Sequence, residues 1–340
     1  MSPVGLPSTL LHVRYVADGE GRDPGPLELL KDAYGDPLGL AALASILIGL
    51  AVVAVVLPRL KTWDAWRLAL TATMEDYRPF LPWILRLSAG IALVAAGVTR
   101  TWFVPHLDHG SRVVAILFLA TGFGILVGVL VRPLALLAIA LWGFAFAFLG
   151  TDLLYAAETV AALVALTALS AGSPSVDDIM ARTMQGAPGP LSRLARLSRF
   201  LGPERDADLS DAYQDWMPFV LRVGLGVSLL AAGLGEKLLS PAAAFWTVDH
   251  YGLAFGPVTP ALWVASAGFV EALIGLLLLV GLGTRPIAVA AFLVLTVTLF
   301  ALPDDPVAAH VPLWGVASAV IVLGPGGWSL DARARRAAAS

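Results

Sequence analysis

Long apolar runs constrain this chain more than any other feature. A helix needs about 20 apolar residues to cross a hydrocarbon core of about 30 Å. Such runs cover residues 38–57, 82–101, 113–131, 133–150, 153–170, 218–238, 260–282, 286–302 and 308–323. Hydrophobic residues make up 58% of the chain and charged residues only 14%, which is outside the range of soluble globular domains. The sequence therefore predicts an all-α, polytopic membrane protein with about nine spans.

The runs after the first belong to two copies of one unit, because a set of residues recurs at matching positions. The matching pairs are Tyr77 and Tyr213, Pro82 and Pro218, Arg86 and Arg222, Gly90 and Gly226, Gly97 and Gly233, Gly122 and Gly275, and Arg132 and Arg285. An internal duplication of a four-helix unit explains this pattern. The predicted divisions are a tail (1–37), a leading transmembrane helix (38–57), a first unit (77–172), a linker (173–212), a second unit (213–324) and a second tail (325–340).

The distribution of Lys and Arg predicts the orientation in the membrane. Cytoplasmic loops carry an excess of these residues, and the excess lies in alternate segments, such as 59–78 and 182–205. This pattern places the tail 1–37 outside and the tail 325–340 in the cytoplasm. An even number of spans then separates equivalent helices, so the two units are parallel repeats. Residues 191–201 in the linker have the spacing of a short amphipathic helix on the lipid surface.

Glu271 is the sharpest candidate for chemistry, because it lies near the middle of its predicted span. A lone carboxylate is costly there, so it should be protonated or paired. Lys237 closes the preceding span, and we expect Glu271 and Lys237 to form one polar site that opens outward, with a proton-handling or quinone-binding role. The alternative is a neutral Glu271 that hydrogen-bonds to a neighbour such as Ser228.

Other polar residues in the spans have simpler interpretations. Arg86 and Arg222 lie about one turn into their helices, and we expect them to extend to the cytoplasmic headgroups. Glu158 lies near the outer face, where Arg100 or Arg112 could pair with it. The glycines at intervals of seven, Gly90 and Gly97 with Gly226 and Gly233, predict close helix packing.

A second candidate site lies on the outer face, where Asp-His pairs recur in the two units. These pairs are Asp108-His109 and Asp249-His250. Neutral imidazoles can ligate metals, and neighbouring carboxylates can orient them. The spacing disfavours a metal or haem, because no two histidines are four residues apart within a span. The pairs could equally brace the outer loops.

Several function classes find no support in the residues. The chain has no cysteine, and a net charge of −3 is too small to indicate a charged partner. We find no phosphate-binding glycine loop, nucleophile elbow or nucleic-acid motif. The sequence therefore indicates a lipid bilayer as the surroundings, no nucleic acid as partner, and neither a catalytic residue nor an oligomeric state.

The second unit resembles the DoxX family of small prokaryotic membrane proteins, which includes DoxD-like subunits. The residues that carry the resemblance are Arg222, Gly226, Gly233, Lys237, Glu271, Gly275 and Arg285. The resemblance implies a prokaryotic plasma membrane and an association with quinone-linked redox systems. It also groups Arg222 and Arg285 with Glu271 and Lys237 as one candidate polar membrane site. The first unit has Thr101 and Phe118 at the lysine and glutamate positions, which indicates a structural copy.

Three functions stay open at this point. The first is a membrane subunit of a redox system, in which the second unit binds quinone or anchors an oxidoreductase. The second is a transporter of a small solute or ion, which the duplication and the midplane carboxylate favour. The third is a scaffold that positions a partner protein without chemistry of its own.

Overall fold

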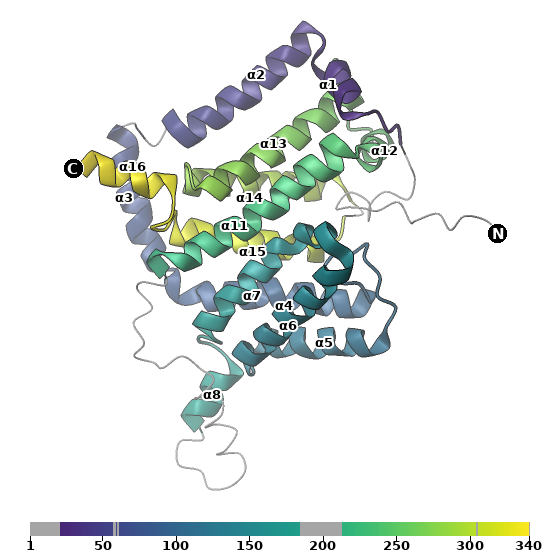
Figure 1. The fold of residues 1–340 in the computed structure, drawn as a ribbon. Coiled ribbons are helices and arrows are strands. Elements are labelled where there is room, and N and C mark those ends of the chain that lie inside the picture. Colours follow the sequence, from purple (N-terminus) through teal and green to yellow (C-terminus); the bar gives the residue numbers. More distant parts are fainter. Residues whose placement is uncertain (1–20, 57–58, 60, 184–212, 304, 340) are drawn as a thin grey trace, which may run out of the picture.

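The computed structural model describes residues 21–56, 59, 61–183, 213–303 and 305–339 (Figure 1). Within these ranges the chain is helical, and β structure is limited to an isolated bridge between Thr101 and Asp108. The prediction of an all-α polytopic protein is confirmed. The predicted amphipathic helix at 191–201 lies outside the described residues.

The first unit contains four apolar helices. They are α4 (Leu81–Thr99), α5 (Arg112–Val127), α6 (Val131–Leu149) and α7 (Ala157–Leu169). Ser111 caps the start of α5 by accepting a hydrogen bond from the Val114 amide, and Gly128 ends it with a φ of 76°. A short 3₁₀ helix, η4 (Gly150–Ala156), joins α6 to α7.

The second unit repeats this order with two additions. Its helices are α11 (Trp216–Ala231), α13 (Pro260–Val280), α14 (Thr284–Ala301) and α15 (Val307–Leu323). The π-helix η5 (Ala232–Leu239) continues α11, and α12 (Ala242–His250) follows it. Thr259 caps α13, with Pro260 at its first position, and Gly281 ends α13 with a φ of 69°.

Within the described residues, six helical stretches are long and apolar enough to cross a membrane. They are Pro37–Val56, Arg78–Thr99, Val131–Leu169, Trp216–Leu239, Pro260–Val280 and Thr284–Ala301. Val131–Leu169 contains both α6 and α7, which pack against each other. Arg112–Val127 and Val307–Leu323 are apolar but shorter. Each apolar run in the described part of the sequence thus coincides with a helix.

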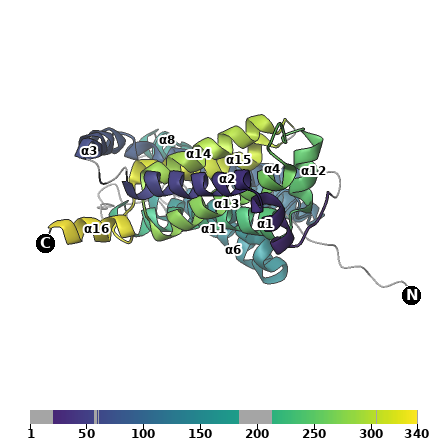
Figure 2. The same cartoon turned by 90° about the horizontal axis from the view of Figure 1, so that it is seen from above.

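The segments outside the two units form helices and contacts that the sequence did not predict. Helix α1 (Pro26–Tyr34) lies in the predicted polar tail, yet its Leu29 and Ala33 are buried against the second unit. Tyr34 hydrogen-bonds to Ser266 of α13, with 3.3 Å between the two hydroxyl oxygens. The leading helix α2 (Pro37–Ala51), extended by the π-helix η1 (Val52–Val56), also packs on α13. Figure 2 shows α2 lying across the second unit.

Three polar helices of the described residues lie outside the apolar bundle. They are α3 (Lys61–Glu75), α8 (Val176–Thr183) and α16 (Leu330–Ala339). In Figure 1, α3 and α16 lie together on the left and α8 lies at the bottom, whereas α1 and α12 lie on the right. The apolar helices run between the left and right sides, as expected for spans with polar segments on either side of a bilayer.

The two units contact each other reciprocally. Helix α4 of the first unit packs on α15 of the second, and α11 of the second packs on α7 of the first. The Ser88 hydroxyl donates to the Pro312 carbonyl across one contact. Across the other, Gly224 lies so close to α7 that an added Cβ would meet the Ala157 carbonyl oxygen at 2.8 Å. The fold therefore has the reciprocal contact pattern of a two-fold dimer within one chain.

The regularly spaced glycines serve packing inside each unit. A Cβ on Gly226 would meet the carbonyl oxygen of Gly275 at 2.8 Å, so α11 and α13 approach backbone to backbone. In the first unit, a Cβ on Gly90 would meet the carbonyl oxygen of Gly122 at 3.0 Å. These glycines set the contact between the first two helices of each unit, whereas other residues form the contact between units.

The expectation that Arg86 and Arg222 extend to the headgroups is wrong. Arg222 is 0% exposed and donates to the carbonyls of Leu278, Leu279 and Trp328 at 2.7, 3.2 and 2.7 Å. These carbonyls include the last turn of α13, whose oxygens have no partner within the helix. A buried guanidinium with several N–H donors satisfies them at once.

Arg86 makes equivalent contacts in the first unit. It is 3% exposed and donates to the carbonyls of Ala171, Pro174 and Leu126 at 2.5, 3.0 and 3.3 Å. The next arginine of each unit behaves similarly: Arg132 donates to Ala168 in α7, and Arg285 donates to Ile321 in α15. The duplicated arginines therefore close the carbonyl ends of two helices in each unit.

Candidate functional site

An apolar cavity beside buried charge lies in the second unit. It has a volume of about 730 Å³ and is bordered by α2, α11, η5, α12, α13, α14 and α15. Most of its wall is aliphatic or aromatic, including Leu262, Trp263, Val270, Leu295 and Leu313. Ligand sites for small molecules are commonly pockets of about 300–1,000 Å³ with apolar walls and few polar groups. This cavity has both properties.

An ion pair lies in the wall of this cavity. The Lys237 ammonium donates to a Glu271 carboxylate oxygen at 2.7 Å, and the two side chains are 13% and 12% exposed. Lys237 lies in the π-helix η5, where the wider turn changes the direction of side chains relative to a continuous α-helix. Glu271 projects from the middle of α13. Both residues line the cavity, so a charged donor and acceptor face an apolar space.

The structure does not group all four residues of the candidate membrane site. Arg222 and Arg285 bind carbonyls at the ends of α13 and α15. Glu271 precedes Leu278 by seven residues, a rise of about 10 Å along the helix. Neither arginine lines the cavity that contains Lys237 and Glu271. The geometry therefore separates a Lys-Glu pair from two structural arginines.

The cavity also contains two polar residues that the sequence reasoning did not select as a site. His310 of α15 and Asp305, which precedes that helix, both line it, with 3.4 Å between Nε2 and a carboxylate oxygen. Their side chains are 1% and 3% exposed. The signal in the sequence was a histidine inside an apolar run with an aspartate five residues earlier. That pair has no counterpart pattern in the first unit, which is why the comparison of repeats did not reveal it.

Ser228 connects the cavity wall to the contact between units. It lines the cavity, and its hydroxyl donates to the Glu158 carboxylate of α7. Glu158 also accepts from the Thr159 hydroxyl at 2.9 Å and is 3% exposed. Glu271 was expected to share a site with Lys237, with Ser228 as the alternative partner, and Glu158 was expected to pair with Arg100 or Arg112. The structure pairs Glu271 with Lys237, as expected, but it pairs Glu158 with Ser228.

The first unit fills the equivalent position with aromatic rings. Phe118, at the position of Glu271, is 0% exposed. Its ring lies 5.0 Å from that of Phe103 and 6.1 Å from that of Trp102, centroid to centroid. Thr101, at the position of Lys237, hydrogen-bonds to the Thr99 hydroxyl at 2.8 Å. The polar pair of the second unit is thus replaced by an aromatic cluster.

The outer Asp-His pairs lie in different surroundings in the two units. His109 stacks on Phe118 with 6.0 Å between ring centroids, and its Nδ1 accepts from the Ser111 amide at 3.1 Å. Asp108 forms the isolated bridge with Thr101. Asp249 and His250 end helix α12, and His250 stacks on Trp246 at 4.3 Å. Among the described residues, no group of three or more His, Asp or Glu side chains is arranged to hold a metal ion.

Comparison with known families gives a match to part of the second unit. The model of the DoxX family matches residues 217–304, which include α11, η5, α12, α13 and α14. Residues 217–304 of the second unit therefore match a DoxX domain. The matched range contains Lys237 and Glu271, whereas His310 and α15 lie beyond it. Neither the curated proteins nor the solved structures gave a match to this chain.

Proposed function

We propose that the DoxX domain binds a membrane-soluble quinone and that the chain is a membrane subunit of a quinone-linked redox system. The observation that carries the proposal is the Lys237–Glu271 ion pair in the wall of the apolar cavity. A quinone combines a ring that carries two carbonyl oxygens with an apolar tail. The cavity offers an ammonium donor for an oxygen and an aliphatic wall for the tail.

The ion pair suits this ligand for an electrostatic reason. An isolated ammonium is costly in an apolar environment, and the adjacent carboxylate offsets much of that cost. Glu271 therefore keeps Lys237 charged and oriented where a carbonyl oxygen could accept its hydrogen bond. Hydrogen bonds from charged donors are stronger than neutral ones, so this contact would fix the ring within an otherwise apolar site.

The cavity also contains groups that can exchange protons. Reduction of a quinone to a quinol takes up two electrons and two protons. Glu271, Lys237, Asp305 and His310 line the cavity and can hold or release protons there. The electrons would come from a partner oxidoreductase, in line with the redox associations that the family resemblance implies.

We place this subunit in the plasma membrane of a prokaryote, with α1 and α12 on the outer side. The support is the excess of arginine at the side that carries α3 and α16, since basic residues concentrate on the cytoplasmic side. In this orientation the Lys237–Glu271 pair lies in the outer half of the second unit.

The test is bound quinone in protein purified in mild detergent. A lipid extract and the ultraviolet spectrum are compared for the wild type, Glu271→Gln and the matched control Glu158→Gln. The control changes another buried carboxylate that does not line the cavity. We expect quinone in the wild type and in Glu158→Gln, and at least a tenfold lower content in Glu271→Gln.

Other results would contradict the proposal. Quinone-free wild-type protein that binds no added quinone removes the redox role. Stabilisation by a water-soluble solute under those conditions would favour a transporter. Protein that is stable and binds neither kind of ligand would favour the scaffold function.

A further inference from the structure

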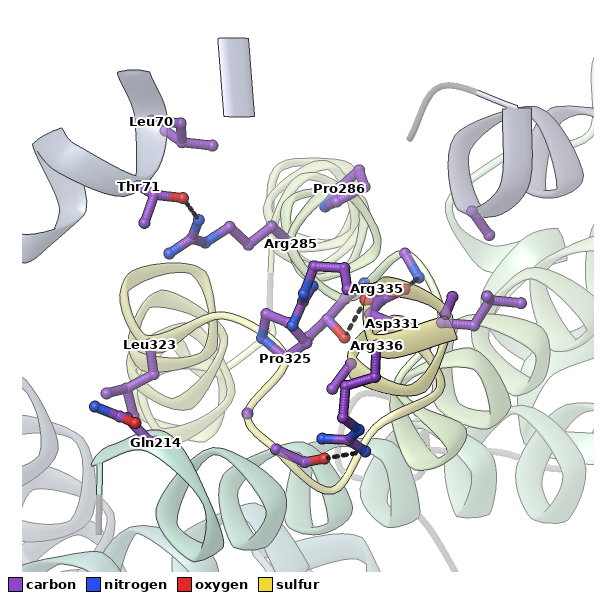
Figure 3. Close-up of a pocket in the computed structure, with 18 of the residues that line it drawn as sticks. Leu70, Thr71, Gln214, Arg285, Pro286, Leu323, Pro325, Asp331, Arg335 and Arg336 are labelled. Atoms are coloured by element: carbon purple, nitrogen blue, oxygen red, sulfur yellow. Dashed lines mark hydrogen bonds between the residues drawn. The ribbon is translucent and has the colours of Figure 1, made fainter. Parts of the chain in front are cut away.

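A second cavity lies at the other end of the second unit from the cavity of the ion pair, beside the polar helices α3 and α16. It has a volume of about 1120 Å³ and is bordered by η1, α3, the start of α14, residues 213–215 and α16. Figure 3 shows Arg285, Arg335 and Arg336 around it, with Thr71 of α3 hydrogen-bonded to Arg285. The cavity of the ion pair shares none of these residues, so the two sites are separate.

The lining is strongly basic. Five arginines border the cavity, Arg59, Arg78, Arg285, Arg335 and Arg336, against two carboxylates, Asp215 and Asp331. Asp331 is engaged at the start of α14, where it accepts from the amides of Gly283 and Thr284 at 2.8 and 2.9 Å. The site therefore has an excess of positive charge, which favours an anionic ligand.

Contacts with the protein hold several of these guanidiniums in place. Arg285 donates to the Thr71 hydroxyl at 2.5 Å and to the Ile321 carbonyl at 3.0 Å. Arg336 donates to the Gly327 carbonyl at 3.4 Å, and Arg59 donates to the Val55 carbonyl at 3.0 Å. A guanidinium has five N–H donors in a fixed plane, so one that binds a carbonyl can also bind the oxygens of a phosphate.

One side of the same cavity is apolar. Residues from several segments line it: Ala54 and Val55 of η1, Leu68 of α3, Leu282 before α14 and Pro286 within α14. Further along α14, Val289 and Leu293 are 41% and 57% exposed, which continues an apolar surface away from the arginines. A ligand with a phosphate at one end and hydrocarbon chains at the other matches this arrangement.

We propose that this cavity binds an anionic phospholipid, with its phosphate among Arg59, Arg335 and Arg336 and its acyl chains along η1 and α14. The location agrees with this, because the site joins the ends of apolar helices to the polar helices α3 and α16. A bound lipid would link α3 and α16 to the DoxX domain through its headgroup.

The test measures stabilisation of delipidated, full-length protein in detergent by three additives. These are phosphatidylglycerol, zwitterionic phosphatidylcholine and inorganic phosphate. We expect a higher melting temperature with phosphatidylglycerol and no comparable shift with the other two. The double variant Arg59→Gln, Arg336→Gln should weaken phosphatidylglycerol binding at least fivefold. Arg333→Gln is the matched control, since Arg333 is exposed on α16 and does not line the cavity.

The outcomes separate the sources of the ligand. An equal shift with phosphatidylcholine would overturn the role of the arginines. A shift with inorganic phosphate alone, lost in the double variant, would assign the site to a soluble anion instead of a lipid. An equal loss in Arg333→Gln would show a general surface-charge effect and overturn the site. Native mass spectrometry of the same samples reports lipid binding even where a variant lowers stability.

Discussion

The two units make the same contacts at the ends of their helices but differ midway along the second helix. At the ends, Arg86 and Arg222 each close the carbonyls of a neighbouring helix. Asp177 and Asp331 also correspond, because each accepts from amides at the start of the third helix of its unit. Midway along the second helix, Phe118 of the first unit lies in an aromatic cluster, whereas Glu271 of the second faces a cavity. The comparison indicates which residues build the unit and which make one copy different.

Residues that both copies use in the same contacts are explained by the fold alone. Backbone carbonyls at helix ends need donors wherever water is absent, so the arginines would be needed in a unit without any ligand. The Lys237–Glu271 pair has no such explanation, because the first unit folds with Thr101 and Phe118 at these positions. A polar pair that the fold does not need is the better candidate for function.

The largest effect should follow removal of a buried arginine from either unit. Arg222→Ala removes the guanidinium from the carbonyls of Leu278, Leu279 and Trp328, and an unpaired buried carbonyl costs about 1–3 kcal/mol. We expect both Arg222→Ala and Arg86→Ala to lose more than about 3 kcal/mol of unfolding free energy. Thermal unfolding in detergent measures this, with exposed Arg333→Ala as control. An Arg86→Ala variant as stable as the wild type would show that Arg86 and Arg222 are not equivalent in their contribution to stability.

A somewhat smaller effect should follow removal of the aromatic ring that replaces Glu271. Phe118→Ala should cost about 3 kcal/mol, because it leaves a cavity inside the Trp102 and Phe103 cluster. Phe123→Ala on the same helix is the matched control, since Phe123 is 64% exposed, and it should cost less than about 1 kcal/mol. Equal melting temperatures for the two variants would contradict the conclusion that the Phe118 ring fills this position of the first unit.

Much of this architecture could be predicted from the sequence. The apolar runs predicted the membrane helices, because length and hydropathy are local to one helix. The division into two units stays a prediction that rests on the recurring Arg and Gly positions. The short helices α1, α3, α12 and α16 were not predicted. Their sequences are brief and partly polar, and their stability comes from packing on the bundle, as with Leu29 of α1.

The site was harder to predict, because its contacts join residues far apart in the chain. Lys237 and Glu271 were both selected, but their contact depends on the π-helical turn at Ala232–Leu239, which no simple pattern indicates. Arg222 was expected at the headgroups because the carbonyl of Trp328, over a hundred residues away, could not be foreseen as its partner. The same holds for Ser228 and Glu158, which meet only where the two units pack.

Converting the second unit into the first should change function more than stability. Lys237→Thr alone leaves Glu271 without its partner and should cost about 2 kcal/mol, less than for a fully buried pair because both side chains keep some exposure. Adding Glu271→Phe removes that unpaired charge and places a ring in the cavity. We expect the double variant to unfold within about 1 kcal/mol of the wild type and to bind no quinone. A double variant less stable than Lys237→Thr would show that the pair also supports the fold.

The smallest effect should be a pH dependence confined to the first unit. Burial lowers the pKa of His109, and nearby Arg100 lowers it further, while Asp108 opposes the shift. A folded-state pKa below the unfolded value of about 6.5 means that the fold favours neutral His109. Its contribution is therefore present above about pH 6.5 and is lost as the pH falls below that value. Protonation would also convert Nδ1, which accepts from the Ser111 amide, into a donor. We expect the melting temperature of the wild type to fall more between pH 7.5 and pH 5 than that of His109→Gln, whereas parallel profiles would show that this loop does not sense pH.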